Sequence, residues 1–128
     1  MVSKHNISGL GVLIAHEHFP VEFKTKRIFF IKNVPVNTVR GKHANKYSNQ
    51  ILFCTAGSIM LTIHGKPDIN GAQNKSELKI EEGDCYIHGK MNWIEMKFLC
   101  VHSELCVLSD QLYDASEYIT NIDEYFKL

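Results

Sequence analysis

The sequence predicts an all-β fold, a sandwich or barrel of short strands followed by a short C-terminal helical segment. Three observations support this fold class: short apolar runs recur along the chain, Gly, Pro and Asn separate them, and helical spacing occurs only near the C-terminus. With 128 residues and 45% hydrophobic content, the chain is long enough to bury one core. We therefore expect residues 1–128 to form a single domain.

The apolar runs place the expected strands. Within the run that starts at Ser58, Ile59, Leu61 and Ile63 alternate with other residues, which predicts that they face the core. The short Ala56-Gly57 link before this run predicts a tight hairpin. The predicted strands cover residues 11–15, 27–32, 50–55, 58–63, 78–80, 85–87 and 99–108.

Two segments lack the pattern of a strand. Residues 65–76 are rich in Pro, Asn and Gly, which predicts an exposed loop. Residues 110–126 carry apolar side chains near helical spacing, so we expect this segment to be partly helical. The side chains at that spacing are Tyr113, Tyr118, Ile122 and Tyr125.

Composition excludes several classes of partner. Fourteen basic residues balance fourteen acidic residues, so we expect neither a nucleic acid nor a membrane as partner. No signal peptide and no apolar run of about 20 residues is evident. Three of the four cysteines, at positions 54, 85, 100 and 106, lie in apolar runs where a free thiol packs as a small hydrophobe. We therefore expect reduced cysteines and a cytoplasmic protein.

The most informative stretch, residues 40–46, has the layout of the first metal motif of the cupins, which are small β-barrels. That motif reads His-x-His, four residues, Glu, six residues, Gly. In this chain the corresponding positions hold His43, Asn45, Gln50 and Gly57. The last histidine of the second cupin motif falls at about Ile94. One imidazole, two amides and an aliphatic side chain make a poor metal site. We therefore expect a cupin-type double-stranded β-barrel (jelly roll) with no metal and no other cofactor.

Five stretches carry a wider family resemblance. They are residues 26–31 (Lys-Arg-Ile-Phe-Phe-Ile), 40–46 (Arg-Gly-Lys-His-Ala-Asn-Lys), 57–58 (Gly-Ser), 93–96 (Trp-Ile-Glu-Met) and 113–119 (Tyr-Asp-Ala-Ser-Glu-Tyr-Ile). With these stretches the chain resembles the sugar-nucleotide 3,4-ketoisomerases, metal-free cupins of the WxcM-like type. The resemblance implies an intertwined homodimer and a dTDP-linked 4-keto-6-deoxyhexose as substrate. It also implies an isomerase role in deoxysugar biosynthesis for surface polysaccharide such as lipopolysaccharide.

Three positions depart from the family pattern. Asn45 replaces the second histidine of His-Ala-His, the residue usually assigned as the base. Phe30 replaces a tyrosine, and Ile94 replaces the histidine after the tryptophan. The chain resembles most a branch of the family with His-Ala-Asn, whose reaction does not follow from the resemblance.

The catalytic candidates are His43, Asn45 and Tyr86. Histidine has an unperturbed pKa of about 6.5, which suits a base that moves a proton near neutral pH. His43 is therefore the candidate base. The Asn45 amide can donate a hydrogen bond to an enediolate oxygen, and Tyr86 or His88 offers another route for a proton.

The candidates for substrate binding are Lys26, Arg27, Arg40, Gln50, Trp93 and Glu95. The arginines suit a diphosphate because a guanidinium is a rigid fork of donors. The resemblance assigns Trp93 to the thymine or the sugar and Glu95 to a sugar hydroxyl. Structural alternatives remain open: a surface ion pair for Arg27, a structural role for Glu95, a core position for Trp93 and packing for the C-terminal tyrosines.

Other functions also remain open. The absence of the expected base favours a non-catalytic subunit that binds a nucleotide sugar. A sugar-nucleotide epimerase that uses His43 with Tyr86 is a second alternative, and a metal-dependent cupin oxygenase is a third. His16 and His18 flank Glu17 and would share one face if this segment is a strand, but the sequence offers no evident third ligand for a metal there.

Overall fold

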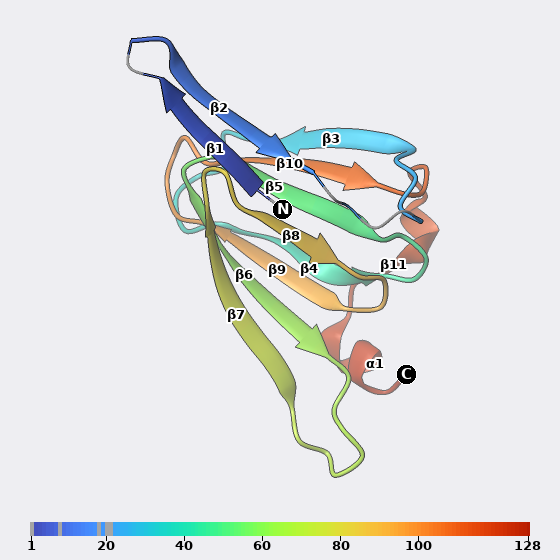
Figure 1. Cartoon of the computed structure of the whole chain (residues 1–128). Coiled ribbons are helices and arrows are strands. Elements are labelled where there is room, and N and C mark those ends of the chain that lie inside the picture. The colour runs from blue at the N-terminus through green and yellow to red at the C-terminus, as the bar shows by residue number, and fades with distance from the viewer. Residues whose placement is uncertain (1, 8, 18, 20–21) are drawn as a thin grey trace.

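The computed structural model describes residues 2–7, 9–17, 19 and 22–128. Figure 1 shows that strands form most of this part of the chain. The strands are β1 (Val2–Ile7), β2 (Gly11–His16), β3 (Arg27–Ile31), β4 (Val39–Asn45), β5 (Gln50–Ala56), β6 (Ser58–Gly65), β7 (Asn74–Glu81), β8 (Cys85–His88), β9 (Trp93–Phe98), β10 (Glu104–Ser109) and β11 (Tyr118–Ile119). The 3₁₀ helix η1 (Ala115–Glu117) and the helix α1 (Ile122–Phe126) follow β10.

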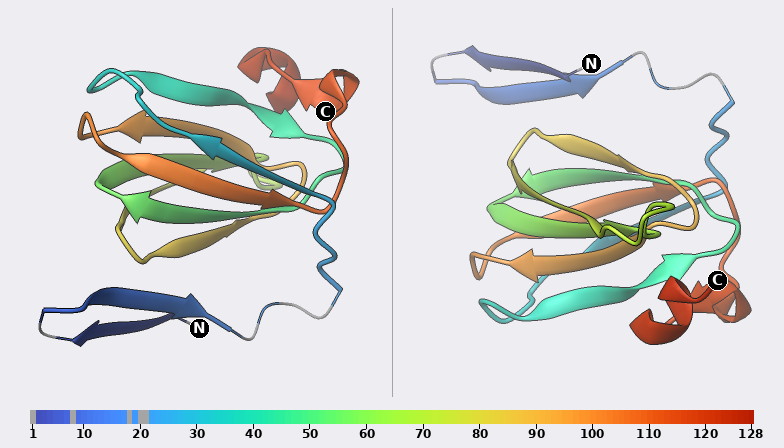
Figure 2. Two further views of the ribbon diagram at one scale, coloured as in Figure 1. Left: turned by 90° about the horizontal axis from the view of Figure 1, so that it is seen from above. Right: turned by 90° about the horizontal axis from the view of Figure 1, so that it is seen from below.

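Two antiparallel sheets form the barrel. One has the strand order β3-β10-β5-β8, and the other has the order β11-β4-β9-β6-β7. β1 and β2 form a separate two-stranded sheet, a hairpin that pairs with neither sheet of the barrel (Figure 2). The predicted fold, an all-β cupin-type jelly roll with a short C-terminal helical segment, is confirmed.

The main core lies between the two sheets. Ile59, Leu61 and Ile63 are 0%, 0% and 7% exposed, which confirms the predicted alternation along β6. They pack with Leu52, Cys54, Ile80, Ile94, Met96, Phe98, Leu105 and Val107. Full burial of such an aliphatic side chain contributes about 1.5–3 kcal/mol.

A second cluster attaches α1 to the outer side of the five-stranded sheet. Ala44, Trp93, Ile119 and Tyr125 form it. The Tyr125 hydroxyl lies 2.7 Å from the Met91 carbonyl oxygen, to which it donates. The Asn121 side chain caps α1 and accepts from the backbone N–H groups of the first turn at 3.0 and 3.1 Å. The predicted helical segment thus covers one end of the outer face.

The link at Gly57 corrects one prediction. Gly57 has φ +69° and makes a tight turn, but β5 and β6 belong to different sheets and do not pair. A Cβ at this position would lie 2.8 Å from the Ser103 Cα, so the chain needs glycine here. The turn is therefore a corner between the sheets and not a hairpin.

Other boundaries also differ from the predictions. The last predicted strand begins only at Glu104, because Ser103 N donates to Cys100 O and closes a turn before it. The loop between β6 and β7 is shorter than predicted and spans residues 66–73. No apolar run predicted β1 or β9, since neither stands out as a short apolar segment.

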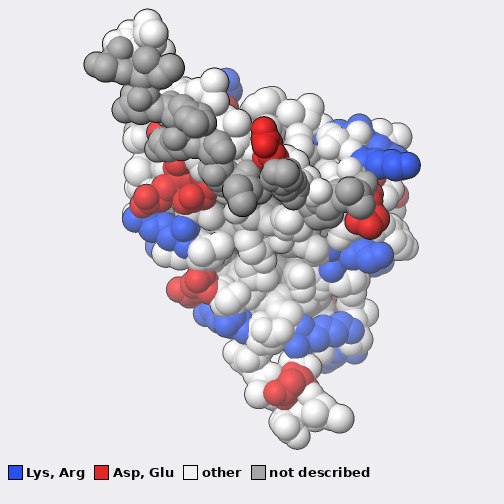
Figure 3. All heavy atoms as spheres, in the orientation of Figure 1, with Lys and Arg blue, Asp and Glu red and all other residues white. Residues whose placement is uncertain are grey.

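Charges are dispersed over the surface seen in Figure 3, where basic and acidic side chains lie interspersed. On β7, Lys75 pairs with Glu77 at 3.7 Å and Lys79 with Glu81 at 3.1 Å. All four cysteines are free thiols. Across the described ranges, no helix has the length and apolar character needed to cross a membrane.

Candidate active site

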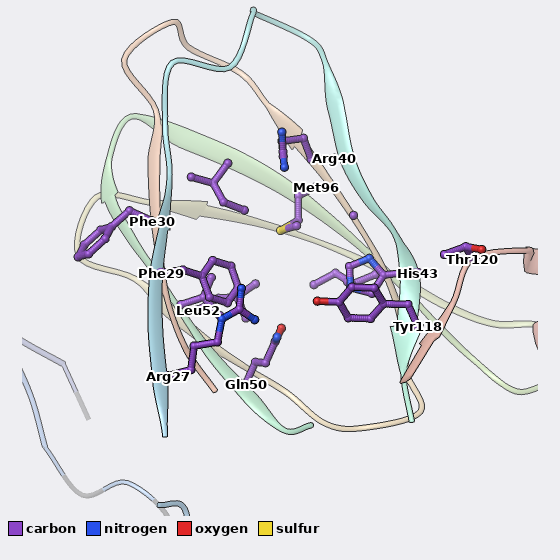
Figure 4. A pocket seen from close by; sticks show the side chains of 14 residues that line it. Arg27, Phe29, Phe30, Arg40, His43, Gln50, Leu52, Met96, Tyr118 and Thr120 are labelled. Carbon is purple, nitrogen blue, oxygen red and sulfur yellow. The ribbon is translucent and has the colours of Figure 1, made fainter. Parts of the chain in front are cut away.

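A pocket of about 460 Å³ lies between the two sheets. This volume is in the range typical of sites for small molecules. Figure 4 shows His43 and Tyr118 beside each other, while Arg27 and Gln50 come from the facing sheet. The polar and aromatic residues around the pocket are Arg27, Phe29, Phe30, Arg40, His43, Gln50, Tyr118 and Thr120.

A bulge in β4 brings Arg40 and His43 to the same pocket. Side chains alternate along a strand, so two residues three positions apart would ordinarily face opposite sides. Between Gly41 and His43 the pairing shifts, which leaves Lys42 as the extra residue. The paired residues are Arg40 with Met96, Gly41 with Glu95 and His43 with Ile94. Because Met96 and Ile94 both line the pocket, their partners Arg40 and His43 line it too.

Glycine at position 41 permits this bulge. Gly41 has φ +88° and Lys42 has φ +55°, both in the left-handed region. A Cβ on Gly41 would lie 2.9 Å from the backbone oxygen of Ile94 and 3.2 Å from Met96 Cε. The Arg-Gly-x-His pattern therefore has a structural cause: the glycine lets the arginine and the histidine share one hollow.

Tyr118 is a pocket residue that the sequence analysis assigned to packing. Its ring lies 4.8 Å from the His43 ring between centroids, at an interplanar angle of 42°. β11 carries Tyr118 and pairs with β4, with Tyr118 opposite Asn45. The specificity of the Tyr-Asp-x-x-x-Tyr-Ile stretch was the signal that could have identified it.

A buried carboxylate holds β11 in place. Glu117 is 3% exposed and accepts from Ser48 Oγ at 2.6 Å and from Ser48 N at 3.0 Å. It also accepts from Tyr47 N at 3.3 Å. These bonds tie the residue before Tyr118 to the turn between β4 and β5, which carry His43 and Gln50.

The two arginines supply the positive charge of the pocket. The Arg27 guanidinium lies over the Phe29 ring at 4.4 Å and the Tyr113 ring at 4.9 Å, measured to the ring centroids. Neither Arg27 nor Arg40 forms an ion pair with a carboxylate among the residues described. Their charges are therefore available to an anion in the pocket.

Asn45 and His88 lie deeper than the pocket lining. Asn45 follows His43 by two positions on β4, so both occupy the inward face, and Asn45 is fully buried. His88 pairs with Gln50 across β8 and β5 and is also fully buried. Burial lowers the pKa of His88 to about 4, and the nearby His43 contributes to the decrease.

Besides Asn45, four predicted residues lie outside this pocket. Trp93 and Glu95 alternate with Ile94 and therefore face the outer side of the sheet, where the Trp93 indole donates to the Glu95 carboxylate at 2.9 Å. Tyr86 packs against the main core, and burial raises its pKa. Lys26 is exposed beside a different groove with Tyr47 and Tyr113. The structure thus gathers Arg27, Arg40, His43 and Gln50 at the pocket, with Asn45 behind them.

His16, at the end of β2, is not among the residues that line this pocket. The His16 ring packs edge-on against the Phe53 ring at 4.7 Å, and His18 lies outside the described residues. Within the described part of the chain, no three His, Cys, Asp or Glu side chains are grouped as they would be around a metal ion.

An imidazole, a phenol and an amide beside two guanidiniums suit proton transfer on an anionic ligand. The comparisons with known proteins agree with this chemistry. Over 125 residues, the chain is 28% identical to the TDP-4-oxo-6-deoxy-α-D-glucose-3,4-oxoisomerase of Aneurinibacillus thermoaerophilus, covering 97% of this chain and 86% of that protein.

Two solved structures are similar over nearly the whole chain. The TDP-quinovose 3,4-ketoisomerase WlaRB of Campylobacter jejuni is 30% identical, with a TM-score of 0.81 and coverage of 99% of this chain and 94% of that one. A histidine-to-asparagine variant of the 3,4-ketoisomerase QdtA of Thermoanaerobacterium thermosaccharolyticum, in complex with TDP-4-keto-6-deoxyglucose, is 25% identical, with a TM-score of 0.82 and coverage of 98% and 88%. The family model described as "FdtA: WxcM-like, C-terminal" matches residues 2–128, and the chain belongs to this family.

Proposed function

We propose that the protein is a metal-independent 3,4-ketoisomerase of a dTDP-linked 4-keto-6-deoxyhexose. The observation that carries the proposal is the convergence of Arg27, Arg40, His43 and Gln50 on one pocket. The relatives named above act on TDP-sugars of this class, which supports the choice of substrate. The product would serve deoxysugar biosynthesis.

His43 performs the proton transfer in this proposal. Its imidazole takes the proton from C3, and the electron pair of the broken C–H bond forms a C3=C4 double bond as the C4 carbonyl becomes an enediolate oxygen. The imidazolium then returns the proton to C4, while the C3 hydroxyl becomes the ketone and its proton passes to the C4 oxygen, which becomes a hydroxyl. The bonds and protons balance, so the step needs no external oxidant or reductant.

Hydrogen-bond donors stabilise the enediolate. The Tyr118 hydroxyl and the Gln50 amide line the pocket beside His43, and such groups lower the energy of a developing oxyanion. The Asn45 amide, behind His43 on the same strand face, is the third candidate donor. Tyr86 has no part in the proposed route because it packs against the main core.

The arginines bind the diphosphate. Arg27 comes from β3 and Arg40 from β4, so each sheet contributes one guanidinium. A bidentate guanidinium–phosphate contact combines charge with two parallel hydrogen bonds. Trp93 and Glu95 have no contact with the ligand in this proposal, because both face the outer side of the sheet.

Incubation with dTDP-4-keto-6-deoxyglucose in deuterated water tests the function. We expect deuterium at C3 and C4 by NMR, and loss of exchange in His43→Gln. Tight TDP binding without exchange in the wild-type protein would contradict the isomerase. It would instead support the non-catalytic nucleotide-sugar subunit that the Asn45 replacement favours.

We also propose that the protein is an intertwined homodimer. The β1–β2 hairpin pairs with neither sheet of the barrel, and β2 exposes Val12 and Leu13 at 51% and 57%. The outer face of the four-stranded sheet exposes Ile28, Phe30 and Ile87 at 55%, 57% and 49%. Exposed apolar surfaces of this kind fit a second copy of the chain. Light scattering should give twice the chain mass of 14.6 kDa, and a monomeric wild-type protein would contradict the proposal.

A further inference from the structure

His88 and Asn45 meet at one turn behind the pocket. The backbone oxygen of Asn45 accepts from Met91 N at 2.7 Å. The next residue of the turn, Asn92, presents its carbonyl oxygen 2.8 Å from His88 Nε2. The backbone of Asn45 and the side chain of His88 are therefore attached to adjacent residues of the turn between β8 and β9.

The contact with Asn92 defines the tautomer of His88. A carbonyl oxygen only accepts hydrogen bonds, so Nε2 must carry the proton. Nδ1 is then an unprotonated acceptor in the interior of the barrel. The low pKa of His88 agrees with a neutral ring at working pH.

Three buried polar atoms lack a protein partner in this region. They are His88 Nδ1, Asn45 Nδ2 and Asn45 Oδ1. Leaving a buried donor or acceptor unsatisfied costs about 1–3 kcal/mol, so native structures pair such groups with protein or with ordered water. The acceptor of His88 is chemically complementary to the N–H groups of Asn45.

We propose that His88 is a positioning residue for Asn45. Because no direct hydrogen bond joins the two side chains, one enclosed water donates to Nδ1 and accepts from the Asn45 amide. This bridge fixes the amide with its NH₂ group toward His88 and leaves the second N–H for the enediolate oxygen. The inference rests on the proposed function and goes beyond it: His88 supports the asparagine that occupies the position of the family's second histidine.

Two substitutions at His88 separate its two hydrogen bonds. His88→Gln keeps a donor for the Asn92 carbonyl oxygen but removes the acceptor at Nδ1. His88→Asn keeps an acceptor near Nδ1 but loses the donor. We expect kcat to fall about tenfold in His88→Gln, with KM nearly unchanged, and to recover in His88→Asn. The reason is that His88→Gln loses the orientation of the Asn45 amide, whose hydrogen bond stabilises the charge that develops on the enediolate.

The outcomes distinguish the two proposals. If the wild-type protein turns over and His88→Gln matches its kcat, the positioning role is overturned and the function stands. A purely structural role of His88 would lower kcat equally in both variants. That result would also overturn the positioning role. A wild-type protein without exchange overturns both.

NMR tests the hydrogen bond independently of turnover. In protein labelled with ¹⁵N at histidine, we expect His88 to show the Nε2–H tautomer and its Nδ1 resonance to shift in Asn45→Ala. An Nδ1 resonance that does not respond to Asn45→Ala would contradict the bond. Thermal unfolding of each variant verifies that the protein is folded.

Discussion

The two ends of the barrel interior differ in chemistry although the same strands form both. On β5, Cys54 belongs to the apolar core, Leu52 belongs to the core and also borders the pocket, and Gln50, the next inward residue, lines the pocket. On β8, Tyr86 packs against the core and His88 lies behind the pocket. Burial raises the pKa of Cys54 to about 11, so the one titratable thiol in the core stays neutral.

This difference indicates how the fold separates stability from function. The apolar end supplies burial, and the polar end has unpaired donors and acceptors that a well-packed core would avoid. At both ends of the barrel every second residue of a strand points inward. The ends differ only in whether these inward side chains are apolar or polar. Substitutions at one end should therefore alter stability, and substitutions at the other end should alter activity or its pH dependence.

The largest expected effect is on catalysis at His43. We predict that His43→Gln lowers the rate of C3 exchange by about 10²- to 10⁴-fold, because it removes the general base. The free energy of unfolding should change by less than about 1 kcal/mol, since the side chain is only half-buried. Exchange kinetics and urea unfolding measure the two quantities. A rate within about threefold of wild type would remove His43 from the mechanism.

The matched change at the apolar end is Leu61→Ala. Leu61 is fully buried in the main core, so the cavity should lower the free energy of unfolding by about 2–5 kcal/mol. The exchange rate per folded molecule should stay close to wild type, because Leu61 is not among the residues that line the pocket. A large loss of rate in the folded protein would show that the two ends are coupled.

His88 should make the polar end sensitive to acid. Its pKa is about 4 in the folded protein against an ordinary value of 6.5, so between these values the unfolded chain binds the extra proton. Stability should therefore fall as the pH decreases from about 6.5 to about 4, by about 3 kcal/mol from this residue. Urea unfolding at both pH values should show a smaller decrease in His88→Gln. Equal decreases in the two proteins would contradict a buried neutral imidazole.

A substitution in the bulge should affect both stability and ligand binding. Gly41→Ala should cost about 2 kcal/mol, because a left-handed conformation is strained for alanine and the new Cβ meets the Ile94 backbone oxygen. Gly71→Ala is the control: φ is also positive, at +79°, but no atom lies within 4 Å of its added Cβ. TDP affinity, measured by calorimetry, should weaken only in Gly41→Ala. Equal effects of the two substitutions on TDP affinity would contradict the role of the bulge in placing Arg40 and His43.

Much of the fold could be predicted from residue patterns. Alternation marked β6, and the runs that start at Gly11, Arg27, Gln50 and Cys85 correspond to β2, β3, β5 and β8. The pairing of strands was harder to predict from the sequence. The Ala56-Gly57 turn is short enough for a hairpin, but which sheet each strand joins depends on contacts between residues distant in the sequence. That residues 1–128 form one domain, and that the protein is cytoplasmic, stay predictions.

The candidate site was predictable only in part. Motif matching identified Arg27, Arg40 and His43, yet it also included Trp93 and Glu95 as neighbours of Ile94. The period of two in β9 turns these two side chains outward, so adjacency in a motif did not mean a shared pocket. Tyr118 was missed because it reaches the pocket through the pairing of β11 with β4.

A crystal structure with bound TDP tests the central claim most directly, since the claim is that one hollow unites two guanidiniums with an imidazole. We predict the diphosphate in contact with Arg27 and Arg40, on the same side of the sheet as His43. A nucleotide bound instead in the groove beside Lys26 and Tyr47, with this pocket unoccupied, would contradict the account.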